Sequence, residues 1–148
     1  VYTDYLFTDK KGNPVDVLGK QNARTNIAPP IPKIKMAWQN NWFRNNHSAS
    51  MSVSWFSAVD HDAQIVDLYQ FDGQFVPPSE IDEDPIIDVR YSYFMEDFFN
   101  SAVTLSAGVN NLLDYKPTLT GQIGGFESRL INNFYRQFFV SIDFTPGG

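Results

Sequence analysis

The chain has 148 residues and a formal net charge of −6, with 17 acidic against 11 basic side chains. One domain is the default for this length, and the acidic balance disfavours nucleic acid as a partner. The absence of cysteine excludes a disulfide framework and a thiolate metal site. Aromatic residues make up 16% of the chain, and the aromatic girdles of outer-membrane barrels are one reason for such richness.

The chain contains no run of about 18 apolar residues, so the sequence predicts no transmembrane helix. It begins at Val1 without a signal peptide, as we expect of a mature or fragmentary chain. Proline and glycine punctuation divides it into about six segments with the residue alternation of β-strands. These segments are residues 1–9, 33–43, 47–59, 86–95, 102–112 and 134–144. The sequence therefore predicts an all-β fold of antiparallel strands connected as a meander.

The segment 47–59 shows the clearest alternation. One predicted face carries Ala49, Met51, Val53, Trp55 and Val59, and the other carries Ser48, Ser50, Ser52 and Ser54. A face of serines suits the water-lined lumen of a barrel, and the solvated face of a soluble sheet would accept it equally well.

The connections between the predicted strands alternate in length. Residues 10–32, 60–84 and 113–132 are long connections, whereas 44–46 and 96–100 are short. Outer-membrane barrels place short turns on the periplasmic side and long loops outside the cell. If the final strand ends in the periplasm, all three long connections fall on the outer side.

The last predicted strand, residues 134–144, has the alternation that a membrane-spanning strand requires. Its apolar face consists of Phe138, Val140, Ile142 and Phe144. Its polar face consists of Gln137, Ser141 and Asp143, with Phe139 as the exception. A terminal aromatic side chain suits a strand that ends at the membrane boundary.

The segment 109–117, VNNLLDYKP, resembles the Asn-Leu-Phe-Asp motif of TonB-dependent outer-membrane receptors and follows the penultimate strand, as in that family. The matching positions are Asn111, Leu112, Leu113 and Asp114. Residues 125–129, Arg136 and the aromatic last strand resemble the C-terminal end of the same family, and residues 32–55 resemble its late hairpins.

Two positions and the C-terminal tail depart from the family pattern. Leu113 replaces the Phe of the motif, and Tyr135 stands where a Gly usually precedes the Arg of the last strand. The family usually stops at its terminal aromatic, whereas Thr-Pro-Gly-Gly follows Phe144 here.

The resemblance implies that residues 1–144 form about six strands of the C-terminal part of a barrel of about 22 strands, with 145–148 as a short tail. An N-terminal plug and the remaining strands are absent from the sequence. Six strands in lipid would leave two unpaired edges. We therefore expect the chain to be part of a longer protein or to be completed by another chain.

The implied function is the uptake of a scarce nutrient, such as a siderophore, a cobalamin or an oligosaccharide, across the bacterial outer membrane. The chain would supply barrel wall, extracellular loops and the terminal assembly strand formed by Phe138, Val140, Ile142 and Phe144. The implied partners are outer-membrane lipid and lipopolysaccharide, the rest of the barrel and plug, and a small-molecule ligand. A TonB-type energy-coupling protein would act through the missing N-terminal part. The resemblance implies no cofactor.

The segment 60–84 carries eight carboxylates and no Lys or Arg. Asp60-His61-Asp62 and residues 80–84 offer the hard oxygen ligands that calcium prefers, without the spacing of an EF-hand. A solvated, metal-free loop also explains this composition, so we predict no metal site.

Other polar and aromatic residues have two interpretations each. Asp88 and Arg90 share the predicted lumen face, where they would contact a plug, line a substrate path or join in a cross-strand ion pair. Arg136 lies near the outer end of the last strand, where it can reach lipid headgroups. Aromatic girdles, rather than a sugar platform, are the preferred interpretation of the three tryptophans. They are Trp38, Trp42 and Trp55.

No catalytic motif stands out, and Gly124-Gly125 lacks the Lys and helix of a phosphate loop, so we predict no enzyme. Two alternatives to the receptor stay open. One is a soluble β-sandwich that binds carbohydrate through exposed Trp and Tyr, with apolar faces meeting in one core. The other is a small autonomous outer-membrane barrel of about eight strands, which needs further strands within residues 10–32 or 64–75.

Overall fold

The computed structural model describes residues 6–22, 28–61, 78–81, 85–96, 98–120, 127, 130 and 135–146. In these residues the chain is all-β, with antiparallel sheets and no helix, which confirms the all-β, antiparallel part of the prediction. The chain divides into two compact units. Unit 1 comprises Val1–Lys35, Phe56–Asp84 and Lys116–Asn133, and unit 2 comprises Met36–Trp55, Pro85–Tyr115 and Phe134–Gly148.

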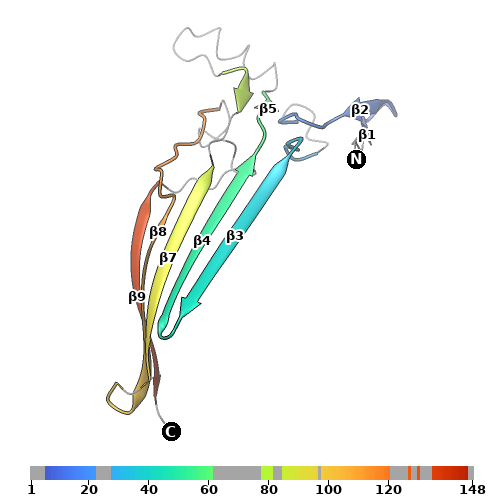
Figure 1. Cartoon of the computed structure of the whole chain (residues 1–148). Helices are drawn as coiled ribbons and strands as arrows, with labels where there is room; N and C mark the ends of the chain where they lie inside the picture. Colours follow the sequence, from blue (N-terminus) through green and yellow to red (C-terminus); the bar gives the residue numbers. More distant parts are fainter. Residues whose placement is uncertain are drawn as a thin grey trace. The chain divides into compact units, whose positions relative to one another are not determined.

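Unit 2 is built on a five-stranded sheet in which every strand has ten residues (Figure 1). The strands are β3 (Lys35–Arg44), β4 (His47–Phe56), β7 (Ile86–Met95), β8 (Ser101–Asn110) and β9 (Gln137–Pro146). They lie in chain order, so the sheet is a meander with β3 and β9 at its edges. Asn45 makes the turn between β3 and β4 at φ 51°, a left-handed conformation that Asn tolerates.

The last two strands differ from the prediction at their ends. β8 ends at Asn110 rather than at residue 112, because Asn111 turns the chain at φ 54°. β9 begins at Gln137 and continues two residues into the segment predicted as a tail. Ser101, at the start of β8, pairs there with Pro146. β7, in contrast, coincides with the predicted segment 86–95.

Unit 1 contains four short strands in the described residues. They are β1 (Leu6–Thr8), β2 (Pro14–Asp16), β5 (Val59–Asp60) and β6 (Glu80–Ile81), paired as β1–β2 and β5–β6. Three of them, β2, β5 and β6, were not predicted as separate strands. Strands of two or three residues are too short to show alternation, and β5 was predicted as the end of the preceding strand.

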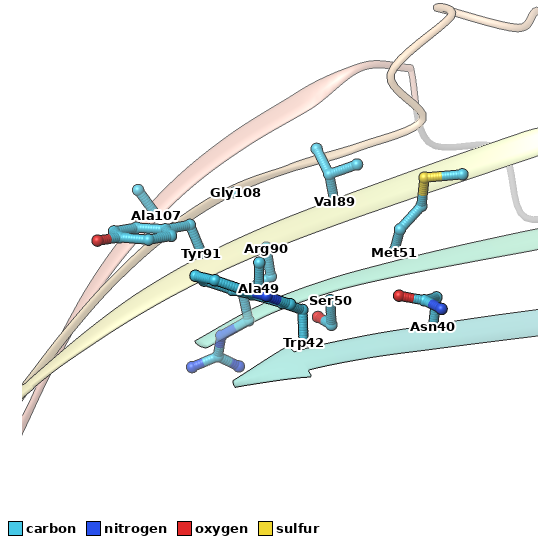
Figure 2. Close-up of a pocket in the computed structure, with 10 residues that line it drawn as sticks. All are labelled: Asn40, Trp42, Ala49, Ser50, Met51, Val89, Arg90, Tyr91, Ala107 and Gly108. Atoms are coloured by element: carbon cyan, nitrogen blue, oxygen red, sulfur yellow. The ribbon is translucent and has the colours of Figure 1, made fainter. Parts of the chain in front are cut away.

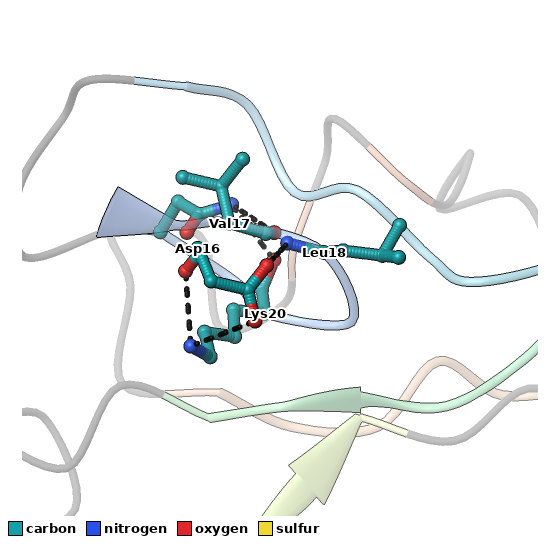
Figure 3. Close-up of polar contacts among 5 residues, drawn as sticks. Asp16, Val17, Leu18 and Lys20 are labelled. Carbon is teal, nitrogen blue, oxygen red and sulfur yellow. Dashed lines mark hydrogen bonds and ion pairs between the residues drawn. The ribbon is translucent and has the colours of Figure 1, made fainter. Parts of the chain in front are cut away.

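The turn between β1 and β2 is closed by the carboxylate of Asp9. Its Oδ1 accepts hydrogen bonds from the backbone N–H groups of Lys11 and Asn13, both at 2.8 Å. These bonds, with that of Asn13 foremost, hold the pKa of Asp9 below its ordinary value. The turn after β2 is similar (Figure 3): Asp16 accepts from Leu18 N–H at 3.0 Å, and Lys20 Nζ donates to the Asp16 carbonyl at 2.9 Å.

Among the described residues, most of the buried apolar side chains belong to unit 1. Its buried apolar side chains are Val17, Ala28, Phe56, Val59 and Ile81. Gln21 and Glu127 are also fully buried, and Gln21 Nε2 donates to Glu127 Oε2 at 3.1 Å. In the described part of unit 2, Val103 is the one buried apolar side chain. The five-stranded sheet therefore carries most of its apolar side chains at least partly exposed.

Candidate functional site

The strand register aligns mostly apolar side chains in rows across β7, β8 and β9, and three of these rows extend to β4. One row consists of Met51, Val89, Val109 and Phe138, the next of Ala49, Tyr91, Ala107 and Val140, and the third of His47, Tyr93, Leu105 and Ile142. Met95, Val103 and Phe144 form a fourth row. The alternation within each strand thus produces one continuous surface, which we call the apolar face.

The edge strand β9 is the most exposed part of the apolar face. Its four predicted residues are exposed to 76% (Phe138), 79% (Val140), 68% (Ile142) and 60% (Phe144). Apolar cross-strand pairs stabilise the sheet, but they cover only the flanks of such side chains. Soluble monomers seldom expose apolar patches of this extent. The apolar face therefore requires an apolar environment or an apolar partner.

A shallow groove of about 360 Å³ crosses the apolar face between Trp42, Met51 and Tyr91 (Figure 2). Figure 2 shows Val89 and Tyr91 projecting from one side of β7 and Arg90 from the other. Trp42 is 47% exposed. The groove is apolar apart from a few side chains, and it offers no cluster of charged groups for chemistry.

The opposite side of the sheet, which we call the polar face, carries hydroxyl groups around one arginine. A row of four serines crosses it: Ser48, Ser92, Ser106 and Ser141. Arg90 Nη2 donates to Ser106 Oγ at 2.9 Å, and the Ser92 and Ser106 hydroxyl oxygens lie 2.8 Å apart. Ser106 is itself buried, so Arg90 and Ser92 supply its hydrogen-bond partners in place of water.

Phe139, the apolar exception in the last strand, lies on the polar face over Gly108. A Cβ atom added to Gly108 would lie 2.4 Å from Cζ of Phe139, so the ring fills the space above the glycine. The Arg90 guanidinium carbon lies 5.9 Å from the ring centroid, within the range of a cation–π interaction. The sequence signal for this contact was a glycine in mid-strand, which often marks close approach of another group.

Neither Asp88 nor Arg90 forms the predicted cross-strand ion pair with another described residue. Asp88 Oδ1 instead accepts the backbone N–H of Asn111 at 2.8 Å. Across the strands, Arg90 faces Ser50 and Gly108 rather than a carboxylate. Asp88 and Arg90 thus serve separate contacts on one face.

The predicted motif residues form a corner after β8. Asn111 uses its side-chain amide to bond both backbone groups of Tyr115: Nδ2 donates to the carbonyl and Oδ1 accepts from N–H, each at 2.8 Å. Asp114 adopts φ 57°, and its Oδ1 accepts the backbone N–H of Arg136 at 3.1 Å. The corner therefore connects the end of β8 to the residue that precedes β9.

The two leucines of the motif contribute differently. Leu112 donates its N–H to the carbonyl of Ile87 at 2.7 Å, which extends the contact between this corner and β7. Leu112 and Leu113 are 39% and 56% exposed. The structure thus brings Asn111, Leu112 and Asp114 into one hydrogen-bonded corner beside the sheet.

Most of the acidic segment 60–84 lies outside the described residues. Among the residues that the structure does describe, no three His, Asp or Glu side chains are grouped to hold a metal ion. His61 is buried, and its Nδ1 is hydrogen-bonded to the Pro78 carbonyl. Asp60 and Glu80 lie opposite each other in the register of β5 and β6, and both are exposed.

Within the described ranges, no helix is both long and apolar enough to cross a membrane. Comparisons with protein-family models, curated proteins and solved structures found no significant match.

Proposed function

We propose that this chain is part of the wall of an outer-membrane transport receptor and that its apolar face contacts lipid. The observation that carries the proposal is the exposure of that face, which is greatest at Phe138, Val140 and Ile142. Burying such a surface in hydrocarbon is favourable by roughly 25 cal/mol for each Å² of apolar area.

The strand lengths support a membrane-spanning role. Each of the five strands has ten residues, and a tilted transmembrane strand needs about 9–11. The polar face, with its row of serines, suits a wet lumen. The connections also support it, because β3–β4 and β7–β8 are joined by short segments and β4–β7 and β8–β9 by long ones.

The TonB-dependent receptor class is supported by the sequence resemblance and by the position of the motif. Asn111 and Asp114 organise a corner between the last two strands, which gives the motif a structural role in closing the C-terminal hairpin. In this proposal a barrel of about 22 strands holds a plug, and the receptor imports a siderophore, a cobalamin or an oligosaccharide.

The partners in this proposal follow from the two edges of the sheet. β3 and β9 each have one sheet neighbour among the described strands. In a bilayer their outer backbone groups would need hydrogen-bond partners, since each unsatisfied group costs several kcal/mol. The remaining strands of the barrel would supply these partners, and lipid, lipopolysaccharide and an energy-coupling protein would complete the assembly.

Site-directed labelling of two neighbouring residues on β9 tests the lipid contact. The chain contains no cysteine, so Ile142→Cys and Ser141→Cys each create a single site for a nitroxide label. In membranes, the label at 142 should collide more with oxygen, and the label at 141 more with a water-soluble nickel complex. Equal accessibility of the two labels would contradict the lipid-facing assignment.

The mass of the protein purified in detergent from its native source separates the receptor from the alternatives. A heat-modifiable species several times larger than 16.9 kDa, or tightly bound companion chains, supports a receptor of which this chain is one part. A monodisperse monomer of 16.9 kDa that needs no detergent would refute the receptor and favour a soluble carbohydrate-binding sandwich.

A further inference from the structure

A hollow on the polar face is lined by one charged residue, Arg90, and otherwise by uncharged residues. Its volume is about 240 Å³, and it lies over β3, β4 and β7. Its polar and aromatic lining residues are Asn41, Phe43, Ser48, Ser50, Arg90 and Ser92. Asp88 lines a neighbouring hollow that also includes Arg90, but it does not line this one. The hollow therefore combines a cation with neutral hydrogen-bonding groups.

The strand register explains why there is open space beside Arg90. Its cross-strand neighbours are Ser50 on β4 and Gly108 on β8, and both are small. An opposite charge directly across the strands would stabilise such a cation. No carboxylate occupies either position here, so the guanidinium is available to a group from outside the sheet.

Arg90 is also held in place before any ligand arrives. It donates one hydrogen bond to Ser106, and Phe139 supports its guanidinium through the cation–π contact. A guanidinium has five N–H donors, and the described residues occupy one of them. Because the side chain is already restrained, it loses less conformational entropy when it binds an anion.

We propose that this hollow binds a small hydroxylated carboxylate, with a single uronic acid unit as the model ligand. The carboxylate would pair with Arg90 in the bidentate geometry that guanidinium groups favour. The ligand hydroxyls would bond to Asn41 and to Ser48 and Ser50. Phe43, which is 75% exposed, offers an apolar ring surface to one side of a sugar.

The size of the hollow suits a small ligand. Its volume of about 240 Å³ lies below the roughly 300–1,000 Å³ of sites for drug-sized molecules, which fits about one sugar ring. The site does not depend on the membrane proposal, because it lies on the polar face and not on the apolar face. The two proposals can therefore fail separately.

Binding of galacturonate to the detergent-purified protein, with any companion segments or chains that it carries, tests the proposal. Saturation-transfer NMR should detect binding of galacturonate, whereas galactose and the methyl ester of galacturonate should bind at least about tenfold more weakly. Arg90→Gln should weaken galacturonate binding by a similar factor. Arg90→Lys should weaken it less, because the charge remains while the bidentate geometry is lost.

Arg136→Gln is the matched control, since it removes one positive charge outside the hollow. It should leave the affinity unchanged, and circular dichroism should show the same strand content for all variants. Equal binding of galacturonate and galactose, equal losses for Arg90→Gln and Arg136→Gln, or no binding at millimolar concentrations would each overturn the proposal. If one of these outcomes occurred while the nitroxide labels at positions 141 and 142 showed the expected accessibility, the ligand proposal would fail and the membrane proposal would stand.

Discussion

Replacing Gly108 by Ala would place a methyl group where the Phe139 ring lies. The added Cβ would lie 2.4 and 2.6 Å from two ring atoms and 2.6 Å from the carbonyl oxygen of Val89. Real Cβ atoms essentially never approach other atoms this closely. The ring can turn aside, whereas the Val89 carbonyl belongs to the paired backbone of β7 and has little freedom to move.

The expected effect follows from two opposing contributions. Overpacking a well-filled site destabilises a protein by about 1–3 kcal/mol. Alanine in a strand interior is favoured over glycine by about 0.5–1 kcal/mol, because glycine loses more backbone entropy on folding. Gly108→Ala should therefore lower the free energy of unfolding by about 1–2 kcal/mol.

Equilibrium unfolding in urea, followed by tryptophan fluorescence, measures this change in lipid vesicles or detergent. A double-mutant cycle with Phe139→Leu provides the control, because leucine removes the ring but keeps an apolar side chain. In that background Gly108→Ala should be less destabilising, with a coupling energy of about 1 kcal/mol. A neutral or stabilising Gly108→Ala, or an equal effect in both backgrounds, would refute the packing of Phe139 over Gly108.

Four further predictions concern other parts of the chain. If the apolar face contacts lipid, as proposed, Ile142→Arg should impair membrane assembly, because a cation facing lipid costs roughly 2–4 kcal/mol; Ser52→Arg on the polar face should be tolerated, and equal outcomes in an assembly assay would contradict the assignment of the faces. Asn111→Ala should lower the unfolding free energy by about 1–3 kcal/mol, because it removes two hydrogen bonds and leaves alanine at a positive φ; an unchanged urea midpoint would count against this corner. Phe99→Gly should stabilise the turn after β7 by up to about 1 kcal/mol in the same assay, because Phe99 has φ 52° and glycine adopts that conformation freely, a gain that the loss of the edge-on contact with the Phe98 ring reduces; a lower midpoint would show that this ring contact outweighs the backbone strain. The pKa of Asp9, measured by NMR titration of its carboxyl carbon, should lie below 3.8, so its contribution to stability is present above pH 3.8 and is lost as the pH falls through the lowered value; a pKa at or above 3.8 would contradict the hydrogen bonds of this turn.

The strands of unit 2 were predictable because their residues alternate over a full strand length. The segment 86–95 shows this best, since its predicted and observed limits agree. The limits of β8 were less predictable, because they depend on the left-handed backbone of Asn111. The register between strands could not be derived from alternation alone. This register places Phe139 opposite Gly108, and Gly108 rather than a carboxylate opposite Arg90.

The short strands of unit 1 depend on contacts between distant residues. Gln21, for example, donates its backbone N–H to the Asp60 carbonyl at 2.9 Å and its side-chain amide to Glu127. These partners lie far apart in the sequence, and no local pattern marks them as neighbours. A polar stretch such as residues 10–32 therefore resembles a loop until its long-range hydrogen bonds are known.

If the five-stranded sheet spans a membrane, as proposed, the equal length of its strands has a consequence for the choice of membrane. Ten residues at about 3.3 Å each give a strand about 33 Å long, and a tilt of about 45° reduces its height to about 23 Å. A wall built from such strands matches a thin hydrocarbon layer, and a thicker bilayer would have to compress around it at a cost for every ångström of mismatch. Strand length alone would thus favour insertion into short-chain lipids over long-chain lipids, independently of any receptor or targeting signal.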